Sequence, residues 1–160
     1  MISEQIPPVR IAESDLHLLK QIAAEALEAR HPVSHFLVAE LERAEISSSA
    51  AAAGSVHLDG WVTFRADADM PSESRRLVLP EKFRDTRLHV SVLSPLGAAL
   101  IGLPVGARMP YAGIDGTRRI VTVENLDPPE GVISLQHRRA MKGLAPPDGN
   151  NPDQPGPTAA

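Results

Sequence analysis

Apolar residues recur at intervals of three and four along the first third of the chain, which is the period of an amphipathic helix. Residues 13–30 carry one such stripe, made of Leu16, Leu19, Ala23, Ala26 and Leu27. After Pro32, residues 34–46 carry a second stripe, made of Leu37, Val38, Leu41 and Ala44. Ser14 and Ser34 are the predicted N-caps. The two stripes predict a short antiparallel αα-hairpin, a minimal coiled coil, over residues 13–46 after a lead-in of residues 1–12.

From Val56 onward, apolar and polar residues alternate, which is the period of a half-buried strand. Five short segments show this alternation: 56–65, 75–79, 88–92, 108–112 and 117–126. Gly60 interrupts the first segment and predicts a bulge or bend. One short apolar helix stands between the third and fourth segments. We therefore predict an α+β fold, in which a curled antiparallel sheet with one short helix follows the hairpin.

The segment 88–106, LHVSVLSPLGAALIGLPVG, contains the change from strand to helix. Ser94 stands where a helix N-cap is expected, and Pro95 stands at the first helical position, where its missing N–H is harmless. The following helix consists largely of small apolar residues, and Gly102 can close it. This pattern predicts a sharp corner and a short helix that packs very close to the sheet.

Two other stretches lack the pattern of a packed element. Residues 47–55, SSSAAAAGS, predict a flexible linker between the hairpin and a body at residues 56–142. Residues 132–142 are expected to continue the body as an extended or helical segment. The final stretch, residues 143–160, is rich in proline and glycine and predicts a disordered tail.

The run from the strand through SPLGAALIG to the VG that follows resembles the C-terminal domain of the GreA/GreB transcript-cleavage factors and of the related regulator of nucleoside diphosphate kinase. The resemblance covers residues 9–126 and implies an FKBP-like fold for the body. It also implies a partner, RNA polymerase, which this family grips at the rim of the secondary channel. The candidate docking residues at the matching corner are Leu93, Ser94, Pro95, Leu96 and Gly97.

The predicted hairpin tip distinguishes between branches of that family. In the resembled cleavage factors, acidic residues at the tip help to hold a catalytic Mg²⁺, an ion that takes hard oxygen ligands. Here the tip contains His31, Pro32 and Val33, and residues 30–35 include no acid. The arm is also much shorter than the cleavage factors' coiled coil. Both departures favour a non-enzymatic regulator, with a Gre-type factor that stimulates transcript cleavage as the alternative.

Further interpretations stay open at the corner. Leu93 stands where cleavage factors commonly have Asp or Asn, and Ser94 and Pro95 serve equally well as a plain N-cap and helix start. The apolar corner, Leu93 to Leu103, also suits a generic protein-binding module for another partner. The FKBP-like fold also suggests prolyl isomerase activity as an enzyme alternative. The few aromatic residues available for such a pocket argue against it; they are Trp61, Phe64, Phe83 and Tyr111.

Composition and charge limit the partners and the cellular location that we expect for this chain. The net charge is −4, which gives no sign of sequence-specific nucleic-acid binding. Residues 1–46 hold eight acids and four bases, whereas residues 56–142 hold ten acids and twelve bases, so an acidic arm precedes a mildly basic body. Cysteine is absent, no apolar run approaches the ~20 residues of a membrane span, and no signal-peptide layout is visible. We therefore expect a cytoplasmic protein without membrane association.

No cofactor or metal site is predicted. His31 and His35 have the spacing of two ligands on a continuous helix, but Pro32 interrupts that helix and no third ligand is evident. Exposed polar side chains are the favoured interpretation of both histidines.

Overall fold

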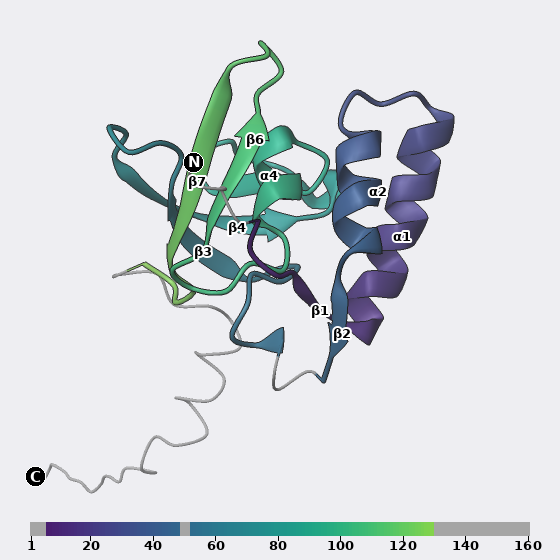
Figure 1. The fold of residues 1–160 in the computed structure, drawn as a ribbon, viewed down its shortest axis with the longest axis horizontal. Coiled ribbons are helices and arrows are strands. Elements are labelled where there is room, and N and C mark those ends of the chain that lie inside the picture. Colours follow the sequence, from purple (N-terminus) through teal and green to yellow (C-terminus); the bar gives the residue numbers. More distant parts are fainter. Residues whose placement is uncertain (1–5, 49–51, 130–160) are drawn as a thin grey trace, which may run out of the picture. The chain divides into compact units, whose positions relative to one another are not determined.

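The computed structural model describes residues 6–48 and 52–129. The predicted continuation at 132–142 and the predicted tail at 143–160 lie outside these described residues. Within them, two helices come first, followed by a five-stranded sheet with a short helix (Figure 1). The α+β fold class predicted from the sequence is confirmed.

The predicted hairpin is confirmed as two helices, α1 (Glu13–Glu28) and α2 (Ser34–Glu42), which lie side by side in Figure 1. We call these helices and the connection between them the arm. The buried residues of the two helices belong to the predicted stripes for the most part: Leu16, Leu19, Ala23 and Ala26 in α1, and Leu37 and Leu41 in α2. Leu27 departs from the stripe, because it is 42% exposed near the end of α1.

Both N-caps predicted for the arm are wrong. The N-cap of α1 is Ala12, which makes no side-chain hydrogen bond, and Ser14 lies within the first turn. The helix starts early because the three preceding residues form a strand that runs directly into it. The N-cap of α2 is Val33, so Ser34 is already helical, and its hydroxyl donates to the carbonyl of His31 at 2.7 Å.

A small two-stranded sheet, which the sequence did not predict, closes the base of the arm. Strand β1 (Arg10–Ala12) pairs in parallel with β2 (Glu45–Ser47), with Ile11 opposite Ile46. The pairing is possible because two antiparallel helices return the chain to the end of the arm from which it started.

The sheet of the body has the strand order β5-β4-β3-β7-β6. In chain order, the elements of the body are β3 (Trp61–Arg65), β4 (Ser72–Val78), the 3-10 helix η1 (Pro80–Lys82), β5 (His89–Ser91), the helix α4 (Pro95–Leu100), β6 (Arg108–Ala112) and β7 (Arg118–Asn125). The pairs of β3, β4, β6 and β7 are antiparallel, but β5 pairs with β4 in parallel. The sheet is therefore mixed rather than antiparallel throughout, because η1 and the loop after it carry the chain back before β5 begins.

The first strand of the body is shorter than predicted. β3 begins at Trp61, after Asp59, whose φ of 63° lies in the left-handed region and ends any extended run. The predicted interruption near Gly60 is confirmed. Val56 and Leu58 are nevertheless buried, so the alternation in the sequence reported their burial correctly and their secondary structure incorrectly.

Part of the predicted flexible linker is structured. Ser47 belongs to β2, and Ala52 and Ser55 are only 3% and 2% exposed. Ser55 forms an isolated bridge with Pro104, beyond the end of α4. Packing against segments distant in the chain buries these small residues, and composition does not reveal it.

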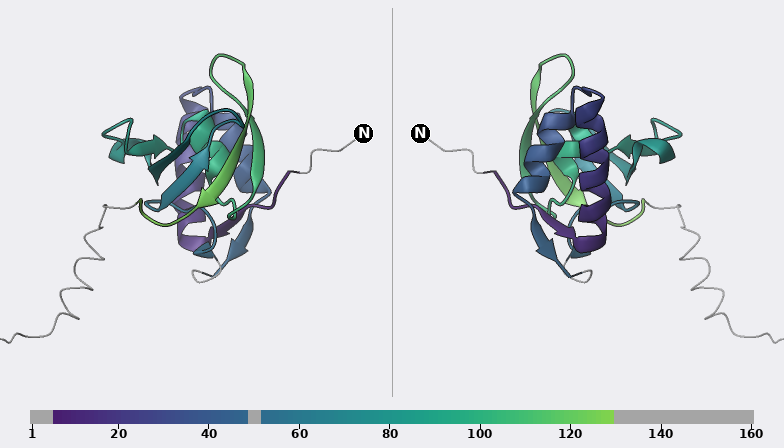
Figure 2. Two further views of the ribbon diagram at one scale, coloured as in Figure 1. Left: turned by 90° about the vertical axis from the view of Figure 1, so that its left-hand side faces the viewer. Right: turned by 90° about the vertical axis from the view of Figure 1, so that its right-hand side faces the viewer.

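One apolar core runs through the arm and the body. It includes Leu19 and Leu37 from the arm and Phe64, Leu77 and Leu100 from the body, all of them fully buried. Figure 2 shows the arm on the side of the sheet that carries α4, and α2 contacts α4. The tip of the arm and the turn between β6 and β7 lie at the same end of this unit (Figures 1 and 2).

Candidate docking surface

The corner between β5 and α4 is held by a compact set of hydrogen bonds. The hydroxyl of Ser94 accepts from the N–H of Gly97 at 3.0 Å and donates to the carbonyl of Ser91 at 2.6 Å. The hydroxyl of Ser91 accepts from the N–H of Leu93 at 3.1 Å. The predicted roles of Ser94 as N-cap and of Pro95 as the first helical residue are confirmed. These bonds fix the path of the backbone through the corner.

Gly97 explains how α4 approaches the strand so closely. A Cβ at this position would lie 1.9 Å from the carbonyl oxygen of Ser91, far inside contact distance. Leu93 and Leu96, on either side of the cap, are only partly buried and pack against the edge of the core. The corner therefore presents apolar side chains from a backbone that has little freedom to move.

The tip of the arm is shaped by backbone conformation and by one histidine. Arg30 has a φ of 55°, a left-handed conformation that ends α1. The N–H of Val33 donates to Nδ1 of His31 at 3.1 Å, which uses the lone pair of that nitrogen. Val33 is buried while Pro32 beside it is exposed.

The carboxylates nearest the tip, Glu28 and Glu40, differ in their surroundings. Glu40 is 5% exposed, and its Oε2 accepts from Nε and Nη2 of Arg43 at 3.0 and 2.6 Å. Glu28 is exposed at the end of α1. Within residues 6–48 and 52–129, no group of three or more His, Asp or Glu side chains is placed to hold a metal ion.

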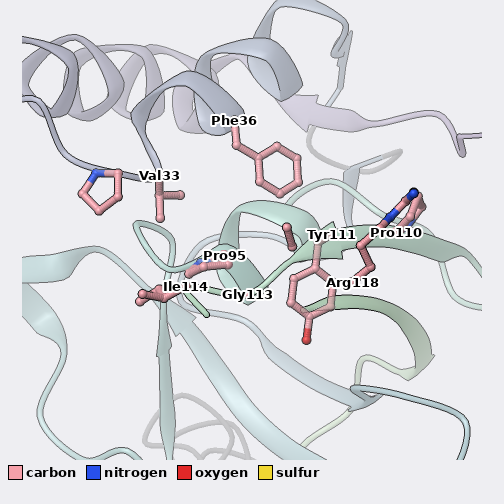
Figure 3. A pocket seen from close by; sticks show the side chains of 10 residues that line it. Val33, Phe36, Pro95, Pro110, Tyr111, Gly113, Ile114 and Arg118 are labelled. Carbon is pink, nitrogen blue, oxygen red and sulfur yellow. The ribbon is translucent and has the colours of Figure 1, made fainter. Parts of the chain in front are cut away.

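The structure brings the predicted tip and the predicted corner together. Pro32 and Val33 from the tip and Pro95 from the corner line one hollow of about 550 Å³, which we call the tip groove. Its other walls are Phe36 of α2 and the β6–β7 hairpin, with Pro110, Tyr111, Ala112, Gly113, Ile114 and Arg118. Figure 3 shows Val33 and Phe36 pointing from the arm toward the body, and Pro95, Tyr111 and Arg118 coming from the body.

The remaining predicted residues fall on neighbouring surfaces. His31 and Leu93 line a second hollow of about 470 Å³ between α1 and η1. Ser94 and Leu96 line a third, of about 310 Å³, beside β5. Gly97 is buried beneath the corner. The corner thus separates three hollows rather than belonging to a single site.

Sequence reasoning missed most of the tip groove. Phe36 lies outside the predicted stripe of α2, and Ile114, 84% exposed in the β6–β7 turn, falls between two predicted strand segments and belongs to neither. An apolar residue in a four-residue turn between polar neighbours was the available signal, since turns are usually polar. The sequence marks Tyr111 only as one of a few aromatic residues, and it marks Arg118 not at all, because only tertiary packing places the two opposite the arm.

Two titratable side chains at or beside the groove, Tyr111 and Asp115, have shifted pKa values. Burial raises the pKa of the Tyr111 hydroxyl, against the opposing effect of the nearby Arg119. In the turn, the Asp115 carboxylate accepts from the N–H of Thr117 at 2.9 Å, and this backbone hydrogen bond is the main cause that lowers the pKa of Asp115. Asp115 therefore holds the turn that carries Ile114.

Of the helices in the described part of the chain, none combines the length and the apolar character needed to cross a bilayer.

Comparisons with known proteins agree on one family. The model for the C-terminal domain of transcription elongation factor GreA/GreB matches residues 51–128. The regulator of nucleoside diphosphate kinase of Escherichia coli strain K12 is 34% identical over 101 residues, which cover 62% of this chain and 74% of that protein. Its counterpart in Shigella flexneri has the same identity and coverage.

Solved structures show the same likeness. The prokaryotic transcription elongation factor GreA/GreB from Nitrosomonas europaea aligns with a TM-score of 0.59 and 26% identity, covering 76% of this chain and 99% of that one. The likeness therefore extends beyond the matched C-terminal domain into the N-terminal part of the chain.

Proposed function

The chain belongs to the GreA/GreB family of transcription elongation factors, and from this premise we propose that it is a non-enzymatic transcription regulator that binds RNA polymerase near the secondary channel. Its relatives named regulator of nucleoside diphosphate kinase support the regulatory reading. On this proposal the protein acts in the cytoplasm without a cofactor and without cleaving the transcript.

The observation that carries the proposal is the chemistry of the arm tip. Transcript cleavage would require carboxylates there to hold a catalytic Mg²⁺. Residues 30–35 include none, and Glu40, the nearest acid on α2, is buried and bound to Arg43. The 16 residues of α1 span about 24 Å at the helical rise, so the arm is also short. These features support binding without catalysis.

We propose the corner Leu93–Gly97 as part of the polymerase-binding surface. Its backbone is fixed by the Ser94 cap, and its apolar side chains remain partly exposed. A surface that needs no ordering on binding loses less conformational entropy, which favours a docking role. The tip residues His31, Pro32 and Val33 lie beside the same corner, because Pro32 and Val33 share a hollow with Pro95.

The bounds of the predicted parts stay a prediction: lead-in 1–12, hairpin 13–46, linker 47–55, body 56–142 and tail 143–160. Within the linker, Ser47 lies in β2 and Ala52 and Ser55 are buried. On the proposed function, the hairpin and the corner bind together and the lead-in serves to fix the arm. This role follows from β1, which ties residues 10–12 to the base of the arm.

The test is binding of the purified full-length chain to core RNA polymerase, with a Gre factor as competitor and a stalled elongation complex to score cleavage. We expect binding that the Gre factor displaces and no shortening of the transcript. A Leu93→Asp variant should change affinity, whereas Val105→Ser, at an exposed position beyond the other end of α4, should not.

Each other outcome points to a different function. Shortened transcripts would support the alternative of a cleavage-stimulating Gre-type factor. No binding at micromolar concentration would rule out the polymerase proposal and leave a generic protein-binding module on the same fold. Addition of nucleoside diphosphate kinase to a separate assay would show whether the effect named in the relatives is direct.

A further inference from the structure

The tip groove has an unusual lining for an exposed hollow. Nine of the ten residues that line it are proline, aliphatic, aromatic or glycine, and the tenth is Arg118. Three prolines and two aromatic rings, Phe36 and Tyr111, supply rigid, flat walls. Figure 3 shows the hydroxyl of Tyr111 directed away from the arm, so it is not aimed at Phe36 across the hollow.

Arg118 is exposed and lies at the start of β7. Among residues 6–48 and 52–129 it forms no ion pair, unlike Arg43, Arg65 and Arg75, which each pair with a glutamate. No acidic side chain lines the groove. The groove therefore combines apolar walls with one unpaired positive charge, and a complementary ligand would be apolar with a negative charge at one position.

The strand that borders the groove limits how a ligand's backbone could bind. β6 is the edge strand of the sheet. Hydrogen-bonded and non-hydrogen-bonded residue pairs alternate along an antiparallel ladder. The N–H of Gly113 donates to the carbonyl of Thr117, so the pair Pro110–Ile120, three residues further along, is a non-hydrogen-bonded pair. The backbone of Pro110 therefore points away from β7. Proline has no N–H, and added strands would therefore find no donor in the middle of this edge.

A polyproline II segment avoids that problem. It forms no ladder of backbone hydrogen bonds and is recognised through side chains that stack on aromatic and proline surfaces. It is also extended before binding, so little conformational entropy is lost. The ring-lined walls of the groove and the blocked edge of β6 both favour such a ligand over an added strand.

We propose that the tip groove binds an extended, proline-rich segment of a partner protein in which an acidic residue next to a proline pairs with Arg118. Phe36 and Tyr111 contact the proline rings, and Ile114 covers the segment from the β6–β7 turn. The proposal goes beyond the binding of RNA polymerase, because it states the chemistry of a ligand for a hollow that holds the arm tip and the corner together.

The first experiment uses the full-length isotope-labelled chain and a synthetic polyproline peptide that carries aspartates. We expect its addition to shift amide signals of Val33, Phe36, Tyr111 and Arg118, with little change elsewhere. A matched peptide with lysines in place of the aspartates should bind more weakly. A peptide of alternating valine and threonine, which favours strands, should bind more weakly as well.

Charge reversal tests the role of Arg118. In Arg118→Glu, affinity for the aspartate peptide should fall roughly tenfold or more, the usual effect of losing a charge-assisted hydrogen bond, while the lysine peptide should gain. Arg87→Glu is the matched control, because its side chain is 88% exposed and it lies outside the groove. Ile114→Ser should weaken both peptides, with Val105→Ser as its control.

Three results would overturn the proposal. Equal losses in Arg118→Glu and Arg87→Glu would indicate non-specific attraction, and shifts outside the groove would indicate another site. Equal affinity for the valine–threonine peptide would indicate strand addition. These peptide assays contain no polymerase, so their failure and a failure of polymerase binding are separate results.

Discussion

The two ends of the arm are held by different means. At the base, β1 pairs with β2, and the Arg43 guanidinium donates to Glu40 and to the carbonyl of Pro7. At the tip, the hydrogen bonds are local, such as the one from the Val33 N–H to His31; Val33 is buried in the core, and the groove beside it is open. A fixed base and an accessible tip suit a docking element, because rigidity is supplied away from the surface that meets a partner.

Of the variants that test this difference between base and tip, Arg43→Ala is expected to lower the unfolding free energy most. Removing the guanidinium leaves the Glu40 carboxylate buried without its partner, which we expect to cost about 3 kcal/mol of unfolding free energy. Urea unfolding followed by far-UV circular dichroism measures it. In the double variant Glu40→Leu with Arg43→Met, most of the loss should be recovered, and no recovery would show that Arg43 acts mainly through the carbonyl of Pro7.

A second change at the base, Gly102→Ala, should cost about 2 kcal/mol. Gly102 has a φ of +79°, and an added Cβ would lie 2.3 Å from Cγ1 of Val9, in the lead-in that precedes β1. Gly106→Ala is a matched control, since Gly106 has a φ of +88° with no atom within 4 Å of the added carbon. It should show the backbone strain alone, about 1 kcal/mol. Equal losses would mean that contact with Val9 contributes nothing.

On the tip side, Ser94→Ala should cost about 1 kcal/mol, the usual effect of losing an N-cap. The same unfolding measurement applies, and Ser94→Asp, which keeps an acceptor for the Gly97 N–H, should recover part of the loss. If Ser94→Ala lowers polymerase affinity while Ser94→Asp restores it, the hydroxyl acts through the geometry of the corner. A loss of binding in both variants with stability retained would indicate direct contact.

The smallest effect concerns pH at the β6–β7 turn. The hydrogen bond from the Thr117 N–H lowers the pKa of Asp115, so its stabilising contribution is present above the ordinary aspartate pKa and is lost as the pH falls through the lowered value. The amide signal of Thr117 should therefore titrate in acid, and should not do so in Asp115→Asn. Because Asp115 is exposed, we expect the global unfolding free energy to change little.

Local patterns account for what could be predicted. The period of apolar residues gave the two arm helices, and the Ser94-Pro95 pair gave the start of α4, because capping and helix initiation depend on neighbouring residues. The N-caps of the arm were predicted wrongly at Ser14 and Ser34, since the strand β1 and the His31 turn set those helix starts instead. Cap preference is a weak signal where flanking backbone is already constrained.

The same distinction between local sequence patterns and tertiary packing applies to the candidate site. The sequence indicated the corner and the tip as two separate features, and the resemblance to the GreA/GreB family gave them a common partner. That Pro32, Val33 and Pro95 line one hollow with Tyr111 and Arg118 could not be foreseen. Those residues come from four different stretches of chain, and no local pattern records which stretches meet.

By itself, the sequence determined the α+β class, the arm, the acid-free tip and the strand–helix corner, because each depends on periodicity or on residues close together in the chain. Only the tertiary structure decided the β1–β2 pairing, the parallel pairing of β5 with β4, the burial of Glu40 against Arg43 and the tip groove. These depend on contacts between distant segments, whose free energies appear only once the core has brought those segments together.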